Sequence, residues 1–237
     1  MPKWLVRLKG EKFDLEDLPS LLHSPEHTVI EENGFYYLKS SDFDLLGSAD
    51  EVRERAIAII KVLNGAVKLH ISSFRGVSED GVTMIEEDGR RHHYVYLGGS
   101  IAARSKVSAN LTVTTSNDTQ QIAPLPRNVE SWISLAKTDK AIADALHLFR
   151  ENTWISLYKV YEIISGDVGG QQAIIRRGWA TKHSLSRFTQ TAQSRAALGD
   201  FARHATNKFK PPLQPMSIKE AEALLRGIIL SWLSSKT

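Results

Sequence analysis

The residues best suited to chemistry lie in one basic stretch, from Arg176 to Lys210. It holds eight cations against a single acid, Asp200, and it also carries His183 and His204. The cations are Arg176, Arg177, Lys182, Arg187, Arg195, Arg203, Lys208 and Lys210. Arginine matches phosphate geometry with a fixed fork of donors, and histidine titrates near neutral pH. This combination predicts binding of RNA or another polyanion.

The same stretch contains the residue types that a metal-independent ribonuclease needs. Such an enzyme uses a base for the 2′-hydroxyl proton, an acid for the leaving 5′-oxygen, and cations for the charged phosphorane. The candidate catalytic residues are His204, His183, Arg203 and Arg177. The candidate nucleic-acid-binding residues are Arg176, Lys182, Arg187, Arg195, Asn207, Lys208 and Lys210.

A structural role for some of these side chains is the alternative. In that interpretation Arg195 and Arg203 cap helices or pair with Asp200, and His204 packs against its neighbours. Arg203 and His204 are adjacent on a predicted helix, so they point about 100° apart and one of them could be buried. The sequence leaves both interpretations open.

Composition narrows the possible functions. Of the 237 residues 42% are hydrophobic, which is enough to bury a core. The chain has no cysteine, which excludes a disulfide, a thiol nucleophile and a cysteine zinc site, and suits a reducing cytoplasm. The sequence shows neither the apolar core of a signal peptide nor a membrane-spanning run. We therefore expect a cytoplasmic protein that does not span a membrane.

The sequence lacks the motifs of metal and cofactor sites. His92 and His93 would point to opposite faces of a strand, and Pro25 disrupts a helical pairing of His23 with His27. A Walker loop, a Rossmann glycine fingerprint and an HExxH motif are all missing. We expect neither a metal nor a cofactor, which makes a metabolic enzyme the least favoured class.

The first half predicts an antiparallel sheet with one amphipathic helix. Asn33-Gly34 and Asp88-Gly89 have the residue types of two-residue hairpin turns, and β-rich runs flank them. Ser48 and Glu51 form a capping box, after which apolar residues recur at helical spacing from Val52 to Leu63. Asn64-Gly65 would end that helix.

The second half predicts a helical bundle, because the apolar period changes from two to about 3.6. Prolines 211, 212 and 215 interrupt it before the last helix. The first predicted helix covers 128–150, and the second runs from a cap at Asn152 to Gly166. Three shorter helices are predicted over 171–177, 183–193 and 196–205. The last helix begins at a capping box of Ser217 and Glu220.

Charge also divides the chain. Residues 1–126 carry a net charge of −4, whereas residues 127–237 carry +7. The polar segment 116–127 contains Pro124 and Pro126, and it separates strand-like from helix-like sequence. We therefore predict an α+β fold with a sheet domain at 1–120 and a helical domain at 127–237.

The chain looks like uncharacterised bacterial proteins whose C-terminal helical part, which here ends in GDFARHATNKFKPPLQPMSIKEAEALLRGIILSWL, resembles the HEPN superfamily. The resemblance covers roughly residues 128–237. It implies a helical bundle that forms homodimers and acts in bacterial defence or toxin-type systems. Many members of the superfamily are metal-independent endoribonucleases, and others only bind RNA or nucleotides.

The superfamily signature is an arginine, usually followed by a polar residue, with a histidine after four to six intervening positions. Arg203 and His204 resemble its first half, but residues 208–210 are lysine, phenylalanine and lysine where the histidine should stand. Arg177 and His183 have five residues between them and fit the spacing.

The leading hypothesis is therefore an RNA-linked protein of a bacterial defence or toxin-type system. If it is an enzyme, it is a metal-independent endoribonuclease. The alternative is a non-enzymatic module that binds nucleic acid or an acidic protein partner. The helical domain is expected to form a homodimer, and the sheet domain to recognise a protein partner.

Overall fold

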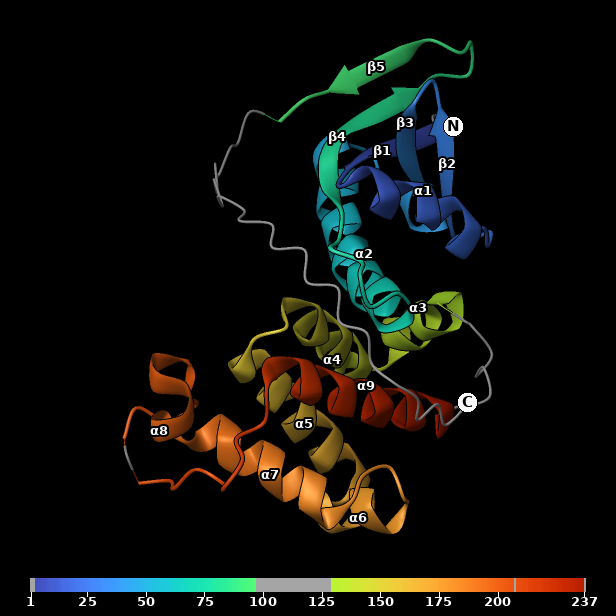
Figure 1. Ribbon diagram of the computed structural model, residues 1–237. Helices are drawn as coiled ribbons and strands as arrows, with labels where there is room; N and C mark the ends of the chain where they lie inside the picture. Colours follow the sequence, from blue (N-terminus) through green and yellow to red (C-terminus); the bar gives the residue numbers. More distant parts are fainter. Residues whose placement is uncertain (1–2, 97–128, 207, 237) are drawn as a thin grey trace.

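The computed structural model describes residues 3–96, 129–206 and 208–236, and Figure 1 shows the chain from the sheet to the helical part. The predicted domain boundary at 116–127 and the candidate residue Asn207 lie outside the described residues. The predicted α+β fold is confirmed, since an antiparallel sheet forms in the N-terminal part and mostly helices form in the C-terminal part. None of the helices in the described part of the chain is both long and apolar enough to span a bilayer.

The sheet has five strands in the order β2-β3-β1-β4-β5, and every neighbouring pair is antiparallel. Both predicted hairpins form. Asn33 and Gly34 have φ of 54° and 79°, as a two-residue turn requires. The second turn is a loop over 87–89, closed by the bond from the Glu86 amide to the Arg90 carbonyl, in which Gly89 has φ of 87°. The strands are β1 (Lys3–Lys9), β2 (His27–Glu32), β3 (Phe35–Ser40), β4 (Ser78–Ile85) and β5 (Arg91–Tyr94).

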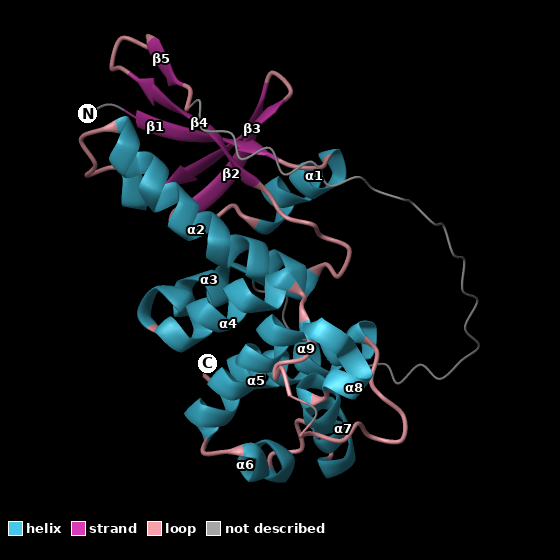
Figure 2. Ribbon diagram, turned by 90° about the vertical axis from the view of Figure 1, so that its left-hand side faces the viewer, coloured by secondary structure: helices cyan, strands magenta, loops and turns pink. Residues whose placement is uncertain are grey.

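Two helices cover one face of this sheet, as Figure 2 shows. They are α1 (Lys12–Leu21) and α2 (Ala49–His70), and the short 3-10 turn η1 (Ser41–Phe43) lies between β3 and α2. Side chains alternate along a strand, so Trp4, Val6 and Leu8 of β1 all reach the core under the helices. The opposite face carries Leu5 and Arg7.

Helix α2 runs beyond its predicted end at Leu63 and continues to His70. Asn64 is buried in the helix, where its amide donates to the carbonyl of Val77 and accepts from the Val77 amide, both at 2.8 Å. A Cβ at Gly65 would come within 2.1 Å of the Leu146 carbonyl oxygen, so glycine permits close helix packing there. The Asn-Gly pair serves tertiary contacts, and the predicted stop was wrong.

The second part contains seven described helices and one 3-10 turn. Residues 128–150 do not form the single predicted helix, because Asp139 interrupts them and caps the second piece by accepting from the Ala141 and Ile142 amides. The elements are α3 (Val129–Thr138), α4 (Lys140–Glu151), α5 (Trp154–Val168), α6 (Gln171–Arg176), α7 (Lys182–Gln193), α8 (Arg195–Leu198), η2 (Gly199–Phe201) and α9 (Ile218–Ser234).

Two further boundaries differ from the predictions. Asn152 ends α4 in the left-handed conformation with φ of 48°, and Thr153 caps α5 instead. The predicted helix at 196–205 is reduced to α8 and η2, after which the chain is irregular up to the terminal helix. The capping box of Ser217 and Glu220 at the start of α9 is confirmed.

Helix α2 connects the sheet to the helical part. Its buried residues belong to one continuous apolar core that also includes α4, α5, α7 and α9. At the C-terminal end of α2, the carbonyls of Lys68 and Leu69 lack partners within the helix, and the Arg226 side chain of α9 donates to both. The two parts therefore share a core instead of being joined by a linker alone.

Candidate nucleic-acid interface

The basic stretch follows the length of α7 and does not form a single patch. Thr181 caps this helix by accepting from the Ser184 amide at 3.0 Å, and twelve residues give it a length of about 18 Å. Residues 176–183, called the α6–α7 corner below, lie at its start. Residues 194–206 and 208–210, called the distal end, lie beyond its last turn.

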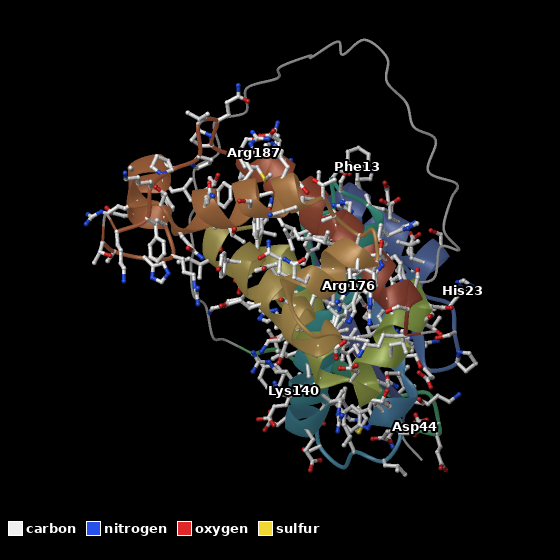
Figure 3. All side chains as sticks on the ribbon, turned by 90° about the horizontal axis from the view of Figure 1, so that it is seen from below. Phe13, His23, Asp44, Lys140, Arg176 and Arg187 are labelled. Carbon is white, nitrogen blue, oxygen red and sulfur yellow. The ribbon has the colours of Figure 1, made fainter. Side chains whose placement is uncertain are left out.

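Arg187 lies between these two regions, and its guanidinium is occupied. It donates to the carbonyls of Gln214 at 2.8 Å and Pro215 at 3.3 Å, and to the Glu220 carboxylate at 2.9 Å. The pKa of Glu220 is lowered to about 2, first by hydrogen bonds from Ser217 and then by Arg187. Arg187 therefore holds the irregular segment before α9 against α7, which is a structural role. Figure 3 shows it apart from Arg176, on a different helix.

The arginines of the distal end are also occupied. Arg195 donates to the Ala205 carbonyl at 2.9 Å and pairs with Asp200 at 3.1 Å. Arg203 pairs with Glu162 of α5 at 2.8 Å, and its guanidinium lies over the Tyr158 ring at 4.4 Å. Each arginine satisfies a carbonyl or carboxylate of the irregular segment or of α5.

His204 packs against an aromatic ring at the distal end. Its imidazole is stacked on Phe209 with ring centroids 4.6 Å apart and an angle of 21° between the planes. The backbone amide of Arg203 donates to the Ala192 carbonyl, which places His204 beside the last turn of α7. Lys208 and Lys210 are exposed in the same segment.

The α6–α7 corner has a different character. Arg176, Arg177, Lys182 and His183 are all exposed within eight residues. The Arg177 guanidinium lies 5.0 Å from the ring centre of Trp179, which is only half-buried. Within the described residues, none of these four side chains has a carboxylate partner.

A groove of about 440 Å³ extends along α7 from this corner. It is lined by His183, Ser186, Arg187 and Gln190 on the helix and by residues 212–214 on the facing segment. Because Arg187 holds that facing segment in place, the groove is a fixed feature of the surface next to the exposed cations.

The two candidate histidines do not share a site. His183 lies in the first turn of α7, and His204 lies beside the last turn of that helix, near Ala192. About 14 Å along the helix axis separates these two positions. An acid and a base that act on one phosphodiester must both reach it by hydrogen bonding. Arg177 and His183 therefore belong to one region, the α6–α7 corner, and Arg203 and His204 belong to another, the distal end.

Three residues that the sequence did not place in the candidate site contribute to these regions. Trp179 offers an aromatic face inside the basic stretch, whereas Glu162 and Glu220 neutralise Arg203 and Arg187. Trp179 could have been selected from its position between cations. The two glutamates lie far away in sequence, so nothing local indicated them.

In the described ranges, no three histidine, aspartate or glutamate side chains lie close enough together to hold an ion. His27 is nevertheless distinctive, because it is only 3% exposed. Its Nδ1 lies 3.0 Å from the Ser40 hydroxyl, and its Nε2 has no hydrogen-bond partner among the described residues. Burial, followed by the nearby charge of Lys137, lowers the pKa of this imidazole.

Comparison with protein-family models, with curated proteins and with solved structures found no match. Function must therefore be inferred from the chain's own residues.

Proposed function

We propose that this chain is an RNA-linked protein of a bacterial defence or toxin-type system that binds RNA through the α6–α7 corner. The observation that carries the proposal is a set of exposed cations at that corner, Arg176, Arg177 and Lys182, that have no carboxylate partner among the described residues. In the distal end, by contrast, Arg195 and Arg203 are neutralised by acids. Unpaired cations bind phosphates because they release condensed counterions from the nucleic acid.

The corner also suits a single strand better than a duplex. Trp179, which is partly buried against the apolar core, lies beside the cations, and unpaired bases stack on aromatic rings. The groove along α7 starts at His183 and presents the polar side chains of Ser186 and Gln190. A strand that places phosphates on the corner can continue along this groove.

Binding without cleavage fits the geometry better than catalysis does. The corner offers one imidazole, whereas acid–base cleavage needs two proton-transfer groups at the same phosphate. Arg203, the residue most similar to the superfamily signature, is already paired with Glu162.

A metal-independent endoribonuclease is the second candidate function. The observation in its favour is that Arg177 and His183 lie exposed in one corner, as the signature spacing requires. Incubation of a mixed RNA pool with the protein and EDTA distinguishes the two candidates. We expect intact RNA, and cleavage that His183→Ala abolishes would establish the enzyme instead.

A homodimer through the helical part belongs to the same proposal. Phe201 and Leu213 are large apolar side chains that stand fully or mostly exposed there. Sedimentation of the wild-type chain and of a Phe201→Ser, Leu213→Ser variant tests this point, and a monomeric wild type would contradict it.

The RNA proposal is tested by binding of a labelled single-stranded RNA over a range of salt concentrations. A variant with Arg176→Ala, Arg177→Ala and Lys182→Ala should bind more weakly. Each lost phosphate contact lowers the slope of log affinity against log salt by about 0.7, so the slope should fall by about 2.

The matched control removes three exposed lysines elsewhere, by Lys9→Ala, Lys61→Ala and Lys159→Ala. These side chains are also exposed, so the net charge changes equally. If the control loses as much affinity and slope as the corner variant, binding follows net charge and the corner is not the site.

A further inference from the structure

A second cavity lies on the face of the sheet that the helices leave uncovered. It has a volume of about 510 Å³, within the range of about 300–1,000 Å³ that small-molecule sites occupy. Leu5 and Tyr37 on this face are buried outside the main core, which confirms that they point away from α1 and α2. Figure 2 shows both helices on the opposite side of the sheet.

Strand register gathers the lining side chains. Arg7 of β1 is opposite Tyr37 of β3, and Thr83 of β4 is opposite His93 of β5. Since alternate residues share a face, Phe35 lies on the same side as Tyr37, two positions along β3. The strands β3, β1, β4 and β5, which are neighbours in that order, therefore place aromatic, basic and hydroxyl groups on one wall of the cavity.

A bulge in β1–β4 pairing shapes the centre of this wall. The register shifts between Val6 and Leu8, and on β4 Gly81 has φ of 119°. A Cβ at Gly81 would lie 2.9 Å from the Tyr94 carbonyl oxygen, so glycine allows β5 to approach. Bulges often redirect side chains at binding sites, and here the shift leaves Arg7 beside Asp80.

The polar side chains of the cavity are held in place by other residues but keep hydrogen-bonding groups for a ligand. Arg7 pairs with the Asp80 carboxylate at 2.6 Å and donates to the Asp80 carbonyl, and its guanidinium lies 5.5 Å from the Phe35 ring centre. Arg91 pairs with Glu32 at 2.8 Å. These two arginines are paired in the same way as Arg195 and Arg203, but both line the cavity. A guanidinium has five donors, so each keeps N–H groups that a ligand in the cavity can reach.

His93 adds a further donor or acceptor. Its Nδ1 lies 3.0 Å from the Thr83 hydroxyl, which fixes the ring and leaves Nε2 available. The half-exposed Phe35 ring, at 50% exposure, gives a flat ligand a surface for stacking. A ligand that fits this cavity would therefore have a planar ring, a hydrogen-bond donor for the Asp80 carboxylate and an anionic group for the arginines.

We propose that this cavity on the uncovered face of the sheet binds a nucleotide, with the base stacked on Phe35 and the phosphate held by Arg7 and Arg91. A base supplies the planar ring and, in three of the four RNA bases, an exocyclic amine for Asp80. The nucleotide is either free or the base of a single strand. This proposal uses no residue of the α6–α7 corner.

The test titrates the full chain with 5′-nucleoside monophosphates, nucleosides, inorganic phosphate and a short single-stranded RNA, with calorimetry or NMR as the readout. Monophosphates should bind more tightly than nucleosides or phosphate alone. Phe35→Ala should weaken their binding at least about fivefold, because stacking on one aromatic ring is of that size. Phe35→Tyr should preserve it, and Arg91→Gln should reduce the advantage of monophosphates over nucleosides.

Phe13→Ala is the matched control, since Phe13 is 78% exposed on α1, outside the cavity. Equal weakening by Phe13→Ala and Phe35→Ala, or no binding of any nucleotide up to millimolar concentration, overturns the proposal. So does phosphate binding as tight as nucleotide binding. Comparison of free monophosphate with RNA shows which source the site prefers.

The two proposals can fail separately. If the variant that lacks Arg176, Arg177 and Lys182 still binds nucleotide, the cavity on the sheet binds nucleotide independently of the α6–α7 corner. That result stands even if the proposed RNA interface is wrong. If Phe35→Ala loses nucleotide but keeps RNA affinity and its salt slope, the corner is the RNA site and the cavity takes free nucleotides.

Discussion

The two ends of α7 carry the same kinds of side chain in opposite circumstances. At the distal end Arg195 and Arg203 pair with Asp200 and Glu162, and His204 stacks on a ring. At the α6–α7 corner Arg176 and Lys182 have no acidic partner in the described residues.

This contrast shows that cationic sequence does not by itself mark a ligand site. The distal end and the segment before α9 are irregular, so their carbonyls lack the partners that a helix would provide. Arginine supplies several donors at once and satisfies these carbonyls. The cations of the corner make no such bonds among the described residues, so they stay available to a ligand.

The largest predicted effect concerns Arg187, the clearest case of an occupied arginine. Arg187→Ala removes bonds to Gln214, Pro215 and Glu220 and leaves carbonyls without a partner. We expect the free energy of unfolding to fall by about 2–4 kcal/mol, because charged hydrogen bonds contribute about 1.5–3 kcal/mol each and are not additive. Urea unfolding measures the loss.

Arg176→Ala is the matched control, because this side chain is exposed and has no acidic partner in the part of the chain that the structure describes. Its effect on unfolding should stay within about 0.5 kcal/mol. Arg187→Lys should recover only part of the stability, since an ammonium lacks the fork that reaches three acceptors. Equal stability of Arg187→Ala and Arg176→Ala would remove the distinction between occupied and free cations.

Much of the fold follows from local sequence signals, and the exceptions have a common cause. The turn at Asn33-Gly34 requires positive φ at both residues, which is a local property and was predicted. Asn64-Gly65 has the same residue types, but Val77 and Leu146 decide its conformation. Asp139 likewise breaks a helix where Lys236, 97 residues away, binds its carboxylate.

The candidate site was predictable in composition but not in geometry. The sequence identified every cation of the basic stretch, yet which ones are free depends on Glu162, Asp200 and Glu220. Two of these acids are 33 and 41 residues from their arginines. Only the third, Asp200, lay within the basic stretch, and its pairing with Arg195 was one of the alternatives considered.

The histidines repeat the contrast, with His183 exposed and His27 buried. The pKa of His27 is lowered below its ordinary value of 6.5, chiefly by burial. The unfolded chain therefore binds a proton that the folded chain does not, and stability falls as pH drops through about 6.5 toward the lower folded pKa. The slope from this group is at most about 1.4 kcal/mol per pH unit.

Unfolding measured from about pH 7.5 to about pH 5.5 checks this, with His27→Asn as the variant and His183→Asn as the control. The His27 variant should have a flatter pH dependence, even if it is less stable at every pH. The His183 variant should keep the wild-type slope. An unchanged slope in His27→Asn would assign the pH dependence to other groups.

The smallest predicted effect is the coupling between Arg203 and Glu162, which are both partly exposed. A double-mutant cycle of Arg203→Ala and Glu162→Ala should give a coupling of about 0.5–1 kcal/mol in unfolding, as expected for a screened ion pair. Arg203→Ala should cost somewhat more than Glu162→Ala, because it also removes the contact with the Tyr158 ring. RNA affinity should not change in either variant. If Arg203→Ala leaves stability intact and abolishes RNA binding, the distal end is the interface.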